Sequence, residues 1–286
     1  MTSQVSSANP ALGRRVLAAG IDTNYLEKGD ADATPVVLLH GSGPGVSAYA
    51  NWRLTMPALA AARRVVAPDL VGFGYTQRPD GHQYTMDNWV AHAEAFVDAL
   101  GLESFSLIGN SFGGALALRM ATLFPERVHR LVLMGSVGIP FELTEGLDEV
   151  WGYTPSTLAM RRLLDFFAYD DTLIDDELAV ARYQASVQAG FQESYAAMFP
   201  APRQRWLESM IVDDEAIRSI GCPALVVHGR EDRVIPPETS RRIFDLIPNA
   251  QLHMFGKCGH WTQIEQASTF NQLVTAFLAE GDARDG

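Results

Sequence analysis

The sequence predicts an α/β fold in which helices cover both faces of a mostly parallel sheet. Short, nearly continuous runs of Val, Leu and Ile recur along the chain between Gly, Pro or Asn residues, a pattern typical of strands buried on both faces. Amphipathic helical patterns separate these runs, as in right-handed parallel crossovers. With 286 residues and 47% hydrophobic side chains, the chain has enough apolar surface for one large domain or for one domain with an insertion.

Eight strands are predicted. Two leading segments, 14–20 and 22–29, are expected to pair antiparallel, and the parallel strands are expected at 36–41, 64–70, 105–111, 130–136, 224–229 and 251–256. Helical patterns at 86–101 and 114–128 flank the strand at 105–111, and Pro125 closes the second helix. The prediction is therefore an eight-stranded, mostly parallel sheet flanked by helices.

One segment breaks this alternation. Residues 138–208 contain helical patterns, such as PSTLAMRRLLDFFAY and DDELAVARYQASVQ, and no convincing strand. We expect a helical lid inserted after the sixth strand, above the carboxyl edge of the sheet. The core is then predicted to comprise residues 1–137 and 209–286, in one compact unit with the lid.

Charge and composition restrict the classes of partner. The net charge is −12 and no cluster of Lys or Arg interrupts it, which argues against binding of nucleic acid. No apolar run reaches the roughly 18–20 residues of a membrane span, and the N-terminal MTSQVSSANPALGRR has no apolar core of a secretory signal. Two cysteines, Cys222 and Cys258, are too few for a disulfide framework. We expect a cytoplasmic protein.

A candidate nucleophile lies between the strand at 105–111 and the following helix. The sequence Gly109-Asn110-Ser111-Phe112-Gly113 is a G-x-S-x-G motif in the context that a nucleophile elbow requires. We expect the glycines to allow a sharp, strained turn that presents the Ser111 hydroxyl above the edge of the sheet. A glycine-rich turn with an incidental serine is the alternative.

A serine hydroxyl needs a base, and the base needs an acid that orients it. His260 follows the last predicted strand, and Asp232 follows the preceding one. The chain order Ser, Asp, His is the order that the α/β-hydrolase fold uses. Because each residue stands at the carboxyl end of a predicted strand, the three are expected to meet as a catalytic triad.

Five further histidines fit the role of the base less well. His82, His92 and His129 have no acid-bearing loop nearby and are expected to be solvated. His253 lies within a strand and His228 precedes the acid turn, so both are expected in the core or behind the catalytic groups.

Acyl transfer also needs donors for the developing oxyanion. We expect one from the backbone N–H of Phe112 and another from that of Ser42 in HGSGPG, whose hydroxyl could assist. A merely tight loop is the alternative for HGSGPG. No H-x-x-x-H, C-x-x-C or G-x-G-x-x-G stands in a suitable context. We therefore expect no metal and no cofactor.

These motifs together resemble one family. With HGSGPGVSAYANW, GNSFGGALAL, HGREDRVIP and GKCGHWTQIE, the chain resembles the meta-cleavage product hydrolases, carbon–carbon bond hydrolases of the α/β-hydrolase superfamily in bacterial aromatic degradation. The lid segments VWGYTPS, FAYDDTL and MFPAPRQRW are most similar to those of the 2-hydroxymuconate-semialdehyde hydrolases. The resemblance covers nearly the whole chain.

The resemblance implies hydrolysis of the C5–C6 bond of a 2-hydroxy-6-oxo-hexa-2,4-dienoate, giving 2-hydroxypenta-2,4-dienoate and a small acid. The carbon leaving group is stabilised by delocalisation into a 2-oxo group, so cations and donors are needed at that end of the substrate. The resemblance places Arg182, Asn51, Asn110 and Trp261 there. It also implies a small anionic substrate and self-association of the chain.

The acyl pocket is expected to be walled by Val137, Leu207 and Ile235, whose branched bulk favours a small acyl group over benzoyl. Two alternatives stay open. The chain could be a carboxylesterase or another serine hydrolase of the same fold, because fold and triad do not determine which bond is cleaved. It could also be a non-catalytic, ligand-binding member of the fold.

Overall fold

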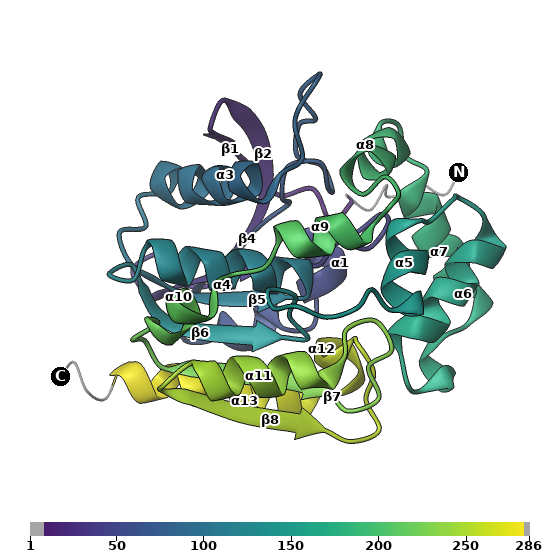
Figure 1. Ribbon diagram of the computed structural model, residues 1–286. Helices are drawn as coiled ribbons and strands as arrows, with labels where there is room; N and C mark the ends of the chain where they lie inside the picture. Colours follow the sequence, from purple (N-terminus) through teal and green to yellow (C-terminus); the bar gives the residue numbers. More distant parts are fainter. Residues whose placement is uncertain (1–8, 283–286) are drawn as a thin grey trace, which may run out of the picture.

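The protein consists of one eight-stranded sheet with helices on both faces and a group of helices beyond one edge (Figure 1). The computed structural model describes residues 9–282, with side chains up to residue 280. The prediction that the N-terminal segment is not a secretory signal concerns residues 1–15, of which residues 1–8 lie outside the described residues. None of the helices within residues 9–282 is long and apolar enough to cross a bilayer.

The sheet confirms the predicted α/β architecture. Its strand order is β1-β2-β4-β3-β5-β6-β7-β8; β2 runs antiparallel to both of its neighbours, β1 and β4, and the strands from β3 to β8 are parallel. The strands are β1 (Arg14–Ala18), β2 (Ile21–Lys28), β3 (Pro35–Leu39), β4 (Arg64–Pro68), β5 (Phe105–Asn110), β6 (Val128–Met134), β7 (Ala224–Gly229) and β8 (Ala250–Phe255).

Two hydrophobic layers lie on opposite faces of the sheet, because successive strand residues point to opposite sides. Val37 and Leu39 of β3 pack with α3 and α4, whereas Val36 and Leu38 pack with α1, α2 and α13. The core helices are α1 (Ala48–Trp52), α2 (Met56–Leu59), α3 (Met86–Ala99), α4 (Phe112–Leu123), α10 (Asp214–Arg218), α11 (Pro237–Leu246), α12 (Thr262–Glu265) and α13 (Ala267–Asp282).

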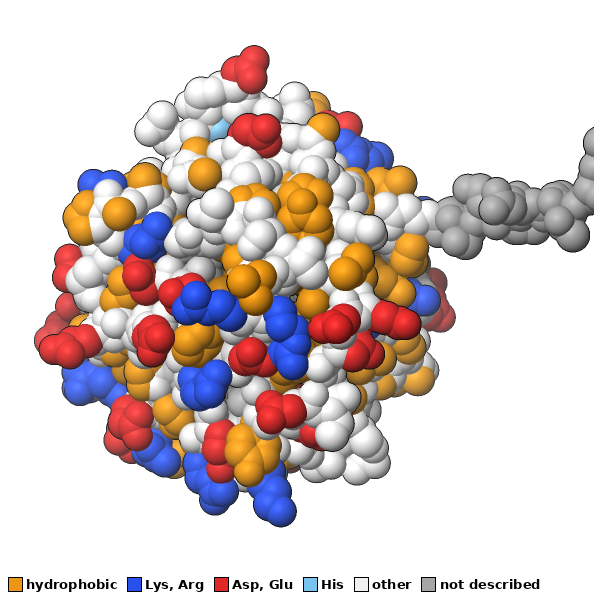
Figure 2. Space-filling view, turned by 90° about the vertical axis from the view of Figure 1, so that its right-hand side faces the viewer, with side chains coloured by type: hydrophobic (Ala, Val, Ile, Leu, Met, Phe, Trp, Pro, Cys, Tyr) orange, Lys and Arg blue, Asp and Glu red, His pale blue; other side chains and the backbone are white. Residues whose placement is uncertain are grey.

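The segment between β6 and β7 is helical. It contains α5 (Glu145–Trp151), α6 (Thr157–Phe167), the 3₁₀ turn η1 (Asp171–Leu173), α7 (Asp176–Ser186), α8 (Phe191–Met198) and α9 (Gln204–Ser209). Helices α5 to α8 gather beyond the carboxyl ends of the strands, and the face that they present carries interspersed acidic and basic side chains (Figures 1 and 2). Val212 N–H donates to the Gly138 carbonyl at 2.8 Å, so the two ends of the segment meet.

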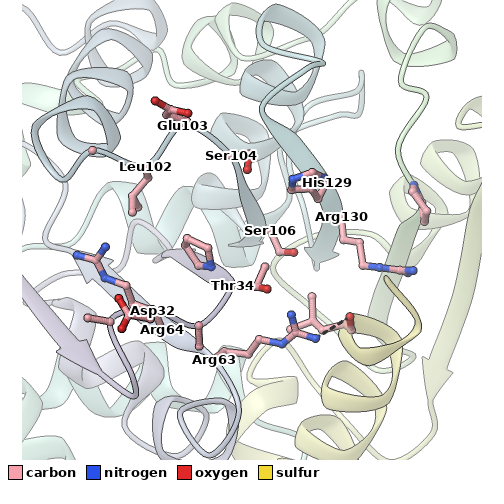
Figure 3. Close-up of a pocket in the computed structure, with 16 residues that line it drawn as sticks. Asp32, Thr34, Arg63, Arg64, Leu102, Glu103, Ser104, Ser106, His129 and Arg130 are labelled. Carbon is pink, nitrogen blue, oxygen red and sulfur yellow. Dashed lines mark hydrogen bonds between the residues drawn. The ribbon is translucent and has the colours of Figure 1, made fainter. Parts of the chain in front are cut away.

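A cavity at the amino edge of the sheet lies away from this helical segment (Figure 3). Arg63 and Arg130 line it, and both contact the carboxyl end of α13: Arg63 Nη2 donates to the Leu278 carbonyl at 2.9 Å, and the Arg130 guanidinium lies 4.9 Å from the Phe277 ring centroid. Cations at a helix carboxyl terminus complement its dipole. The two arginines therefore anchor α13, and Ser111 lies at the opposite edge.

One prediction about the histidines was wrong. His92, expected in solvent, is 1% exposed on the inner face of α3, and its Nε2 lies 2.8 Å from the Thr23 hydroxyl of β2. The helix packs against the antiparallel strands that precede the parallel sheet, and this contact between distant segments is not visible in the local pattern.

Candidate active site

Ser111 is the first residue after β5 and the N-cap of α4. Its backbone has φ 55° and ψ −115°, a left-handed conformation that non-glycine residues rarely adopt. Neighbouring strands hold it there: Ser111 N–H donates to the Met134 carbonyl at 2.8 Å, and Val137 N–H donates to the Ser111 carbonyl at 3.2 Å. The strain that the motif predicts is therefore carried by the serine itself.

The glycines of the motif serve close packing. A Cβ at Gly109 would stand 2.3 Å from the Gly113 carbonyl oxygen, and one at Gly113 would stand 2.3 Å from the Leu39 carbonyl oxygen. Neither glycine has a positive φ. The expectation that glycines supply the strained turn is thus corrected: they let α4 approach β5 and β3 closely enough for the serine to sit at the sheet edge.

Asp232 and His260 meet behind this serine. His260 Nδ1 lies 2.7 Å from Asp232 Oδ2, and both residues follow the carboxyl ends of adjacent strands, β7 and β8. The two loops pack closely because Gly229 has no side chain: a Cβ there would stand 2.0 Å from the Gly259 carbonyl oxygen. With Nδ1–H donated to the carboxylate, the lone pair of His260 is on Nε2, where a base is needed.

The environment of Asp232 keeps it ionised. Burial by itself would raise the pKa of this carboxyl, but the charge of His260 and hydrogen bonds from His228 and His260 hold the pKa well below its ordinary value. A carboxylate that stays charged can stabilise the imidazolium that forms when the base takes a proton.

The expected oxyanion donors stand on either side of Ser111. Phe112 opens α4, so its backbone N–H is one of the first-turn groups without an intrahelical acceptor. Ser42 lies in the loop after β3 and lines the cavity beside Ser111. Its hydroxyl accepts a hydrogen bond from Trp151 Nε1 at 2.9 Å, and the Tyr195 hydroxyl lies 2.9 Å from its carbonyl oxygen. Two residues of the helical segment therefore hold this loop.

Most of the predicted site residues line one cavity at the carboxyl edge of the sheet. These are Ser42, Asn51, Asn110, Ser111, Arg182, His260 and Trp261. Asp232 stands behind His260, and Phe112 contributes its backbone while its side chain is buried in the core. The cavity thus combines a serine and a histidine with groups suited to an anion.

Val137, Leu207 and Ile235 do not line this cavity. All three are at most 1% exposed and belong to the hydrophobic core. Ile235 N–H instead donates to Asp232 Oδ1 at 3.0 Å, so this residue holds the acid turn. The apolar wall is formed by other side chains, namely Leu147, Val150, Phe167 and Val234.

Arg182, on α7, is a partly buried cation that has no acidic partner among residues 9–280. Burial and the nearby charge of Arg53 lower the pKa of its guanidinium to about 10. Nη2 donates to the Pro44 carbonyl at 3.2 Å, and Nε is buried without a hydrogen-bond acceptor. Among the described residues, no carboxylate lies within 4.0 Å of its nitrogen atoms, although the chain has 34 acidic residues. An anionic ligand is the partner that this arrangement lacks.

The side-chain amides of Asn51 and Asn110 and the indole of Trp261 complete the polar lining of the cavity. Asn51 Nδ2 is buried without an acceptor, whereas its Oδ1 lies 3.5 Å from Gly41 N. Asn110 Nδ2 donates to the Met134 carbonyl at 3.3 Å. Asn51, which lines the cavity, therefore has an amide donor without an acceptor among the described residues.

Comparisons with known proteins agree with this geometry. The family model described as alpha/beta hydrolase fold matches residues 34–267. A 2-hydroxymuconate semialdehyde hydrolase of Pseudomonas sp. strain CF600 is 58% identical, over 96% of both chains. A 2-hydroxy-6-oxo-2,4-heptadienoate hydrolase of Pseudomonas putida strain F1 is 57% identical, over 97% of this chain and 100% of its own. The chain belongs to the meta-cleavage product hydrolases of the α/β-hydrolase family.

A solved meta-cleavage product hydrolase supports the same assignment. The enzyme of Pseudomonas fluorescens IP01, in a serine-to-alanine variant complexed with acetates, has a TM-score of 0.94 and 55% identity, over 95% of this chain and 99% of that one. The resemblance and the fold predicted from the sequence are both confirmed.

Besides the wall residues Leu147, Val150 and Val234, sequence reasoning did not assign two residues that contact the catalytic groups of this meta-cleavage product hydrolase site. Phe167 ends α6; its ring stacks on Trp261 at 4.9 Å, and its carbonyl accepts from His260 N–H at 2.8 Å and from Trp261 N–H at 3.1 Å. His228 contacts Asp232, and the sequence indicated only that it lies behind the catalytic groups. Neither role could be read from local spacing, because each depends on segments far apart in the chain.

Proposed function

We propose that this protein hydrolyses the C5–C6 bond of 2-hydroxy-6-oxo-hexa-2,4-dienoates. Its substrates are 2-hydroxymuconate semialdehyde and small 6-alkyl analogues, in bacterial meta-cleavage degradation of monocyclic aromatics. The products are 2-hydroxypenta-2,4-dienoate and a small carboxylic acid. The observation that carries the proposal is the guanidinium of Arg182, which has no acidic partner among the described residues and lies in the same cavity as Ser111 and His260. An esterase of neutral substrates does not need this cation.

The proposed chemistry begins at the anionic end of the substrate. Arg182, with Asn51 and Asn110 beside it, binds the carboxylate and 2-oxo oxygens. A proton added at C5 converts the dienol into the 2,6-diketone, and His260, alone or with Ser111, assists this transfer. The 2-oxo group can then accept the electron pair of the breaking bond, which makes carbon a workable leaving group.

In the second half of the proposed reaction, Ser111 acts as the nucleophile. His260 Nε2 takes the proton of Ser111 as the hydroxyl adds to C6, and the N–H groups of Ser42 and Phe112 bind the oxyanion. As the C5–C6 bond breaks, its electron pair moves into the 2-oxo group, and the resulting dienolate takes the proton from the His260 imidazolium. 2-Hydroxypenta-2,4-dienoate leaves, an acyl-serine remains, and His260 is again neutral. Water, deprotonated by His260, hydrolyses this ester and frees the serine.

We further propose that residues 138–208 act as the lid of this site. They supply Arg182 and Phe167 to the cavity, and Trp151 and Tyr195 hold the oxyanion loop at Ser42. The last turn of α9 passes the expected boundary by one residue. A lid that carries the substrate's counter-ion excludes water when it is closed and completes the site.

The apolar wall supports a preference for small acyl groups. Leu147, Val150 and Val234 are branched side chains, and Phe167 stacks on Trp261 beside them. Side chains that already fill this space reject a phenyl ring sterically. Two relatives are named for 2-hydroxymuconate semialdehyde and for 2-hydroxy-6-oxo-2,4-heptadienoate. Both of these compounds have a small substituent at C6.

The test is optical, because ring-fission products absorb visible light. Purified protein is mixed with the ring-fission products of catechol, 3-methylcatechol and 2,3-dihydroxybiphenyl, and kcat/KM is measured from the loss of absorbance. We expect the first two to react fastest and Ser111→Ala to lose nearly all activity. Faster turnover of the phenyl-bearing product contradicts the proposed pocket. Full activity of Ser111→Ala indicates direct attack by water, and hydrolysis of simple esters alone indicates an esterase.

A further inference from the structure

We propose that His228 is a positioning residue of this reaction: it donates a hydrogen bond to Asp232 and thereby limits the proton affinity of His260. The inference rests on the proposed function for its kinetic consequences. Its geometric basis is independent of the substrate, because it concerns a second side chain that shares Asp232 Oδ2 with His260.

The protonation of His228 at Nε2 follows from its neighbours. The residue is fully buried in β7. Nε2 lies 3.0 Å from Asp232 Oδ2 and 3.1 Å from the Ile235 carbonyl oxygen, and both of these atoms can only accept. Nε2 must therefore carry a hydrogen. Nδ1 lies 2.7 Å from the Ser240 hydroxyl, which orients the ring from its other side.

Four donors surround the Asp232 carboxylate. Oδ2 receives His260 Nδ1–H at 2.7 Å and His228 Nε2–H at 3.0 Å. Oδ1 receives the backbone N–H groups of Val234 at 2.8 Å and Ile235 at 3.0 Å. The acceptor sites of the carboxylate are thereby filled. His228 is the only side chain that competes with His260 for the same oxygen among the described residues.

The competition has a definite sign. A donor on Oδ2 draws electron density from the atom that stabilises the His260 imidazolium. Without this donor, more of the carboxylate charge acts on His260, and the apparent pKa of the base rises.

Other titratable groups near the cluster do not take this place. The buried thiol of Cys258 and the carboxylates of Glu231 and Glu265 lie on the His260 loop side, where Glu231 accepts from Cys258 N–H at 3.0 Å and Glu265 from Gly259 N–H at 2.8 Å. Arg233 turns away, with its guanidinium 4.9 Å from the Phe166 ring centroid. The effect is therefore assigned to His228.

The experiment compares two substitutions of similar size. His228→Gln keeps an N–H donor near the position of Nε2, whereas His228→Met has none. His92→Leu is the matched control, because it also removes a buried histidine that is hydrogen-bonded to a hydroxyl, but at α3. Two rates are measured against pH: kcat/KM for 2-hydroxymuconate semialdehyde, and inactivation of Ser111 by a serine-directed phosphonate.

We expect His228→Met to move the acidic limb of both profiles upward by about one pH unit, which lowers both rates about tenfold below that limb. His228→Gln and His92→Leu should keep the limb of the unsubstituted protein. Coincident limbs for the Met and Gln variants would overturn the proposal, since only packing would then be involved. If His228→Met does not fold, Ser240→Ala, which loosens the ring at Nδ1, replaces it, and an unshifted limb overturns the proposal equally.

The two profiles also separate this inference from the proposed function. A protein that is inactive on every ring-fission product but shows the shifted phosphonate profile keeps the role of His228 and refutes the proposed substrate. Turnover of the semialdehyde with no shift in either profile refutes the role of His228 and leaves the proposed function intact.

Discussion

Replacing Arg182 with Met is expected to stabilise the protein while removing most of its activity. The guanidinium is partly buried, has no acidic partner among the described residues, and leaves Nε without an acceptor. Methionine preserves much of the apolar stem and removes the charge. The two effects have opposite signs, so a general loss of folding cannot imitate them.

The size of the stability effect follows from the pKa. Burial and the charge of Arg53 lower the pKa of Arg182 from its ordinary value, which it has in the unfolded chain, to about 10 in the folded one. The charged form is therefore disfavoured by folding at every pH below about 10, and this cost disappears only as the pH rises through the unfolded value. The difference corresponds to about 3 kcal/mol. Partial exposure and loss of the Pro44 hydrogen bond reduce the net gain to about 1–2 kcal/mol, or a rise in Tm of about 2–6 °C.

The activity effect follows from the substrate carboxylate. Removing one partner of a buried charge pair costs about 2–5 kcal/mol, which lowers kcat/KM roughly 30- to several thousandfold. Thermal unfolding and the optical assay measure the two quantities, with Arg162→Met as the control because that arginine is 59% exposed on α6. If Tm falls by several degrees in Arg182→Met, the claim that the charge of Arg182 destabilises the folded protein is wrong. An unchanged kcat/KM would refute its contact with the substrate.

Two further predictions concern stability. Gly113→Ala should lower Tm by several degrees, because the new Cβ would stand 2.3 Å from a strand carbonyl oxygen. Gly221→Ala is the control: its Cβ meets no atom within 4 Å, so Tm should change little. Equal Tm values for the two variants would contradict the close approach of α4 to the sheet. The free energy of unfolding should fall by about 3 kcal/mol between pH 6.5 and 4, because burial lowers the pKa of His40 and of His92 from 6.5 to about 4, so the unfolded chain takes up protons first. Burial raises the pKa of Asp69 to about 6, so its protonation in the folded state stabilises the protein over this pH range and cancels the effect of about one histidine. His92→Leu should therefore remove most of the pH dependence of the free energy of unfolding, measured by urea titration at the two pH values. An unchanged pH dependence would contradict this assignment.

The sheet and the nucleophile motif were predictable because their signals are local. Parallel strands buried on both faces need continuous apolar runs, and each predicted run overlaps a strand of the structure. The motif around Ser111 required only that a strand precede it and a helix follow it. The helical segment was visible for the same reason, since it lacks such runs over some seventy residues.

The cavity wall was not predictable in this way. Val137 and Ile235 follow strand ends, as site residues do, yet their side chains point into the core. Val234, one residue away from Ile235, lines the cavity instead. Both residues are buried in the same core, but only Val234 also borders the cavity, and the backbone of the Asp232 turn sets which of the two side chains does so.

The sequence by itself determined where the strands and the helical insertion lie along the chain, and which residue types are available for acid–base, nucleophilic and anion-binding chemistry. The tertiary structure alone decided which of these groups meet. It placed the strain on Ser111 rather than on its glycines, gave Arg182 no acidic partner within the part of the chain that the structure describes, and brought His228 against Asp232. Periodicity reports which side of an element is buried, whereas the distance between two charges depends on how separate loops pack at the edge of one sheet.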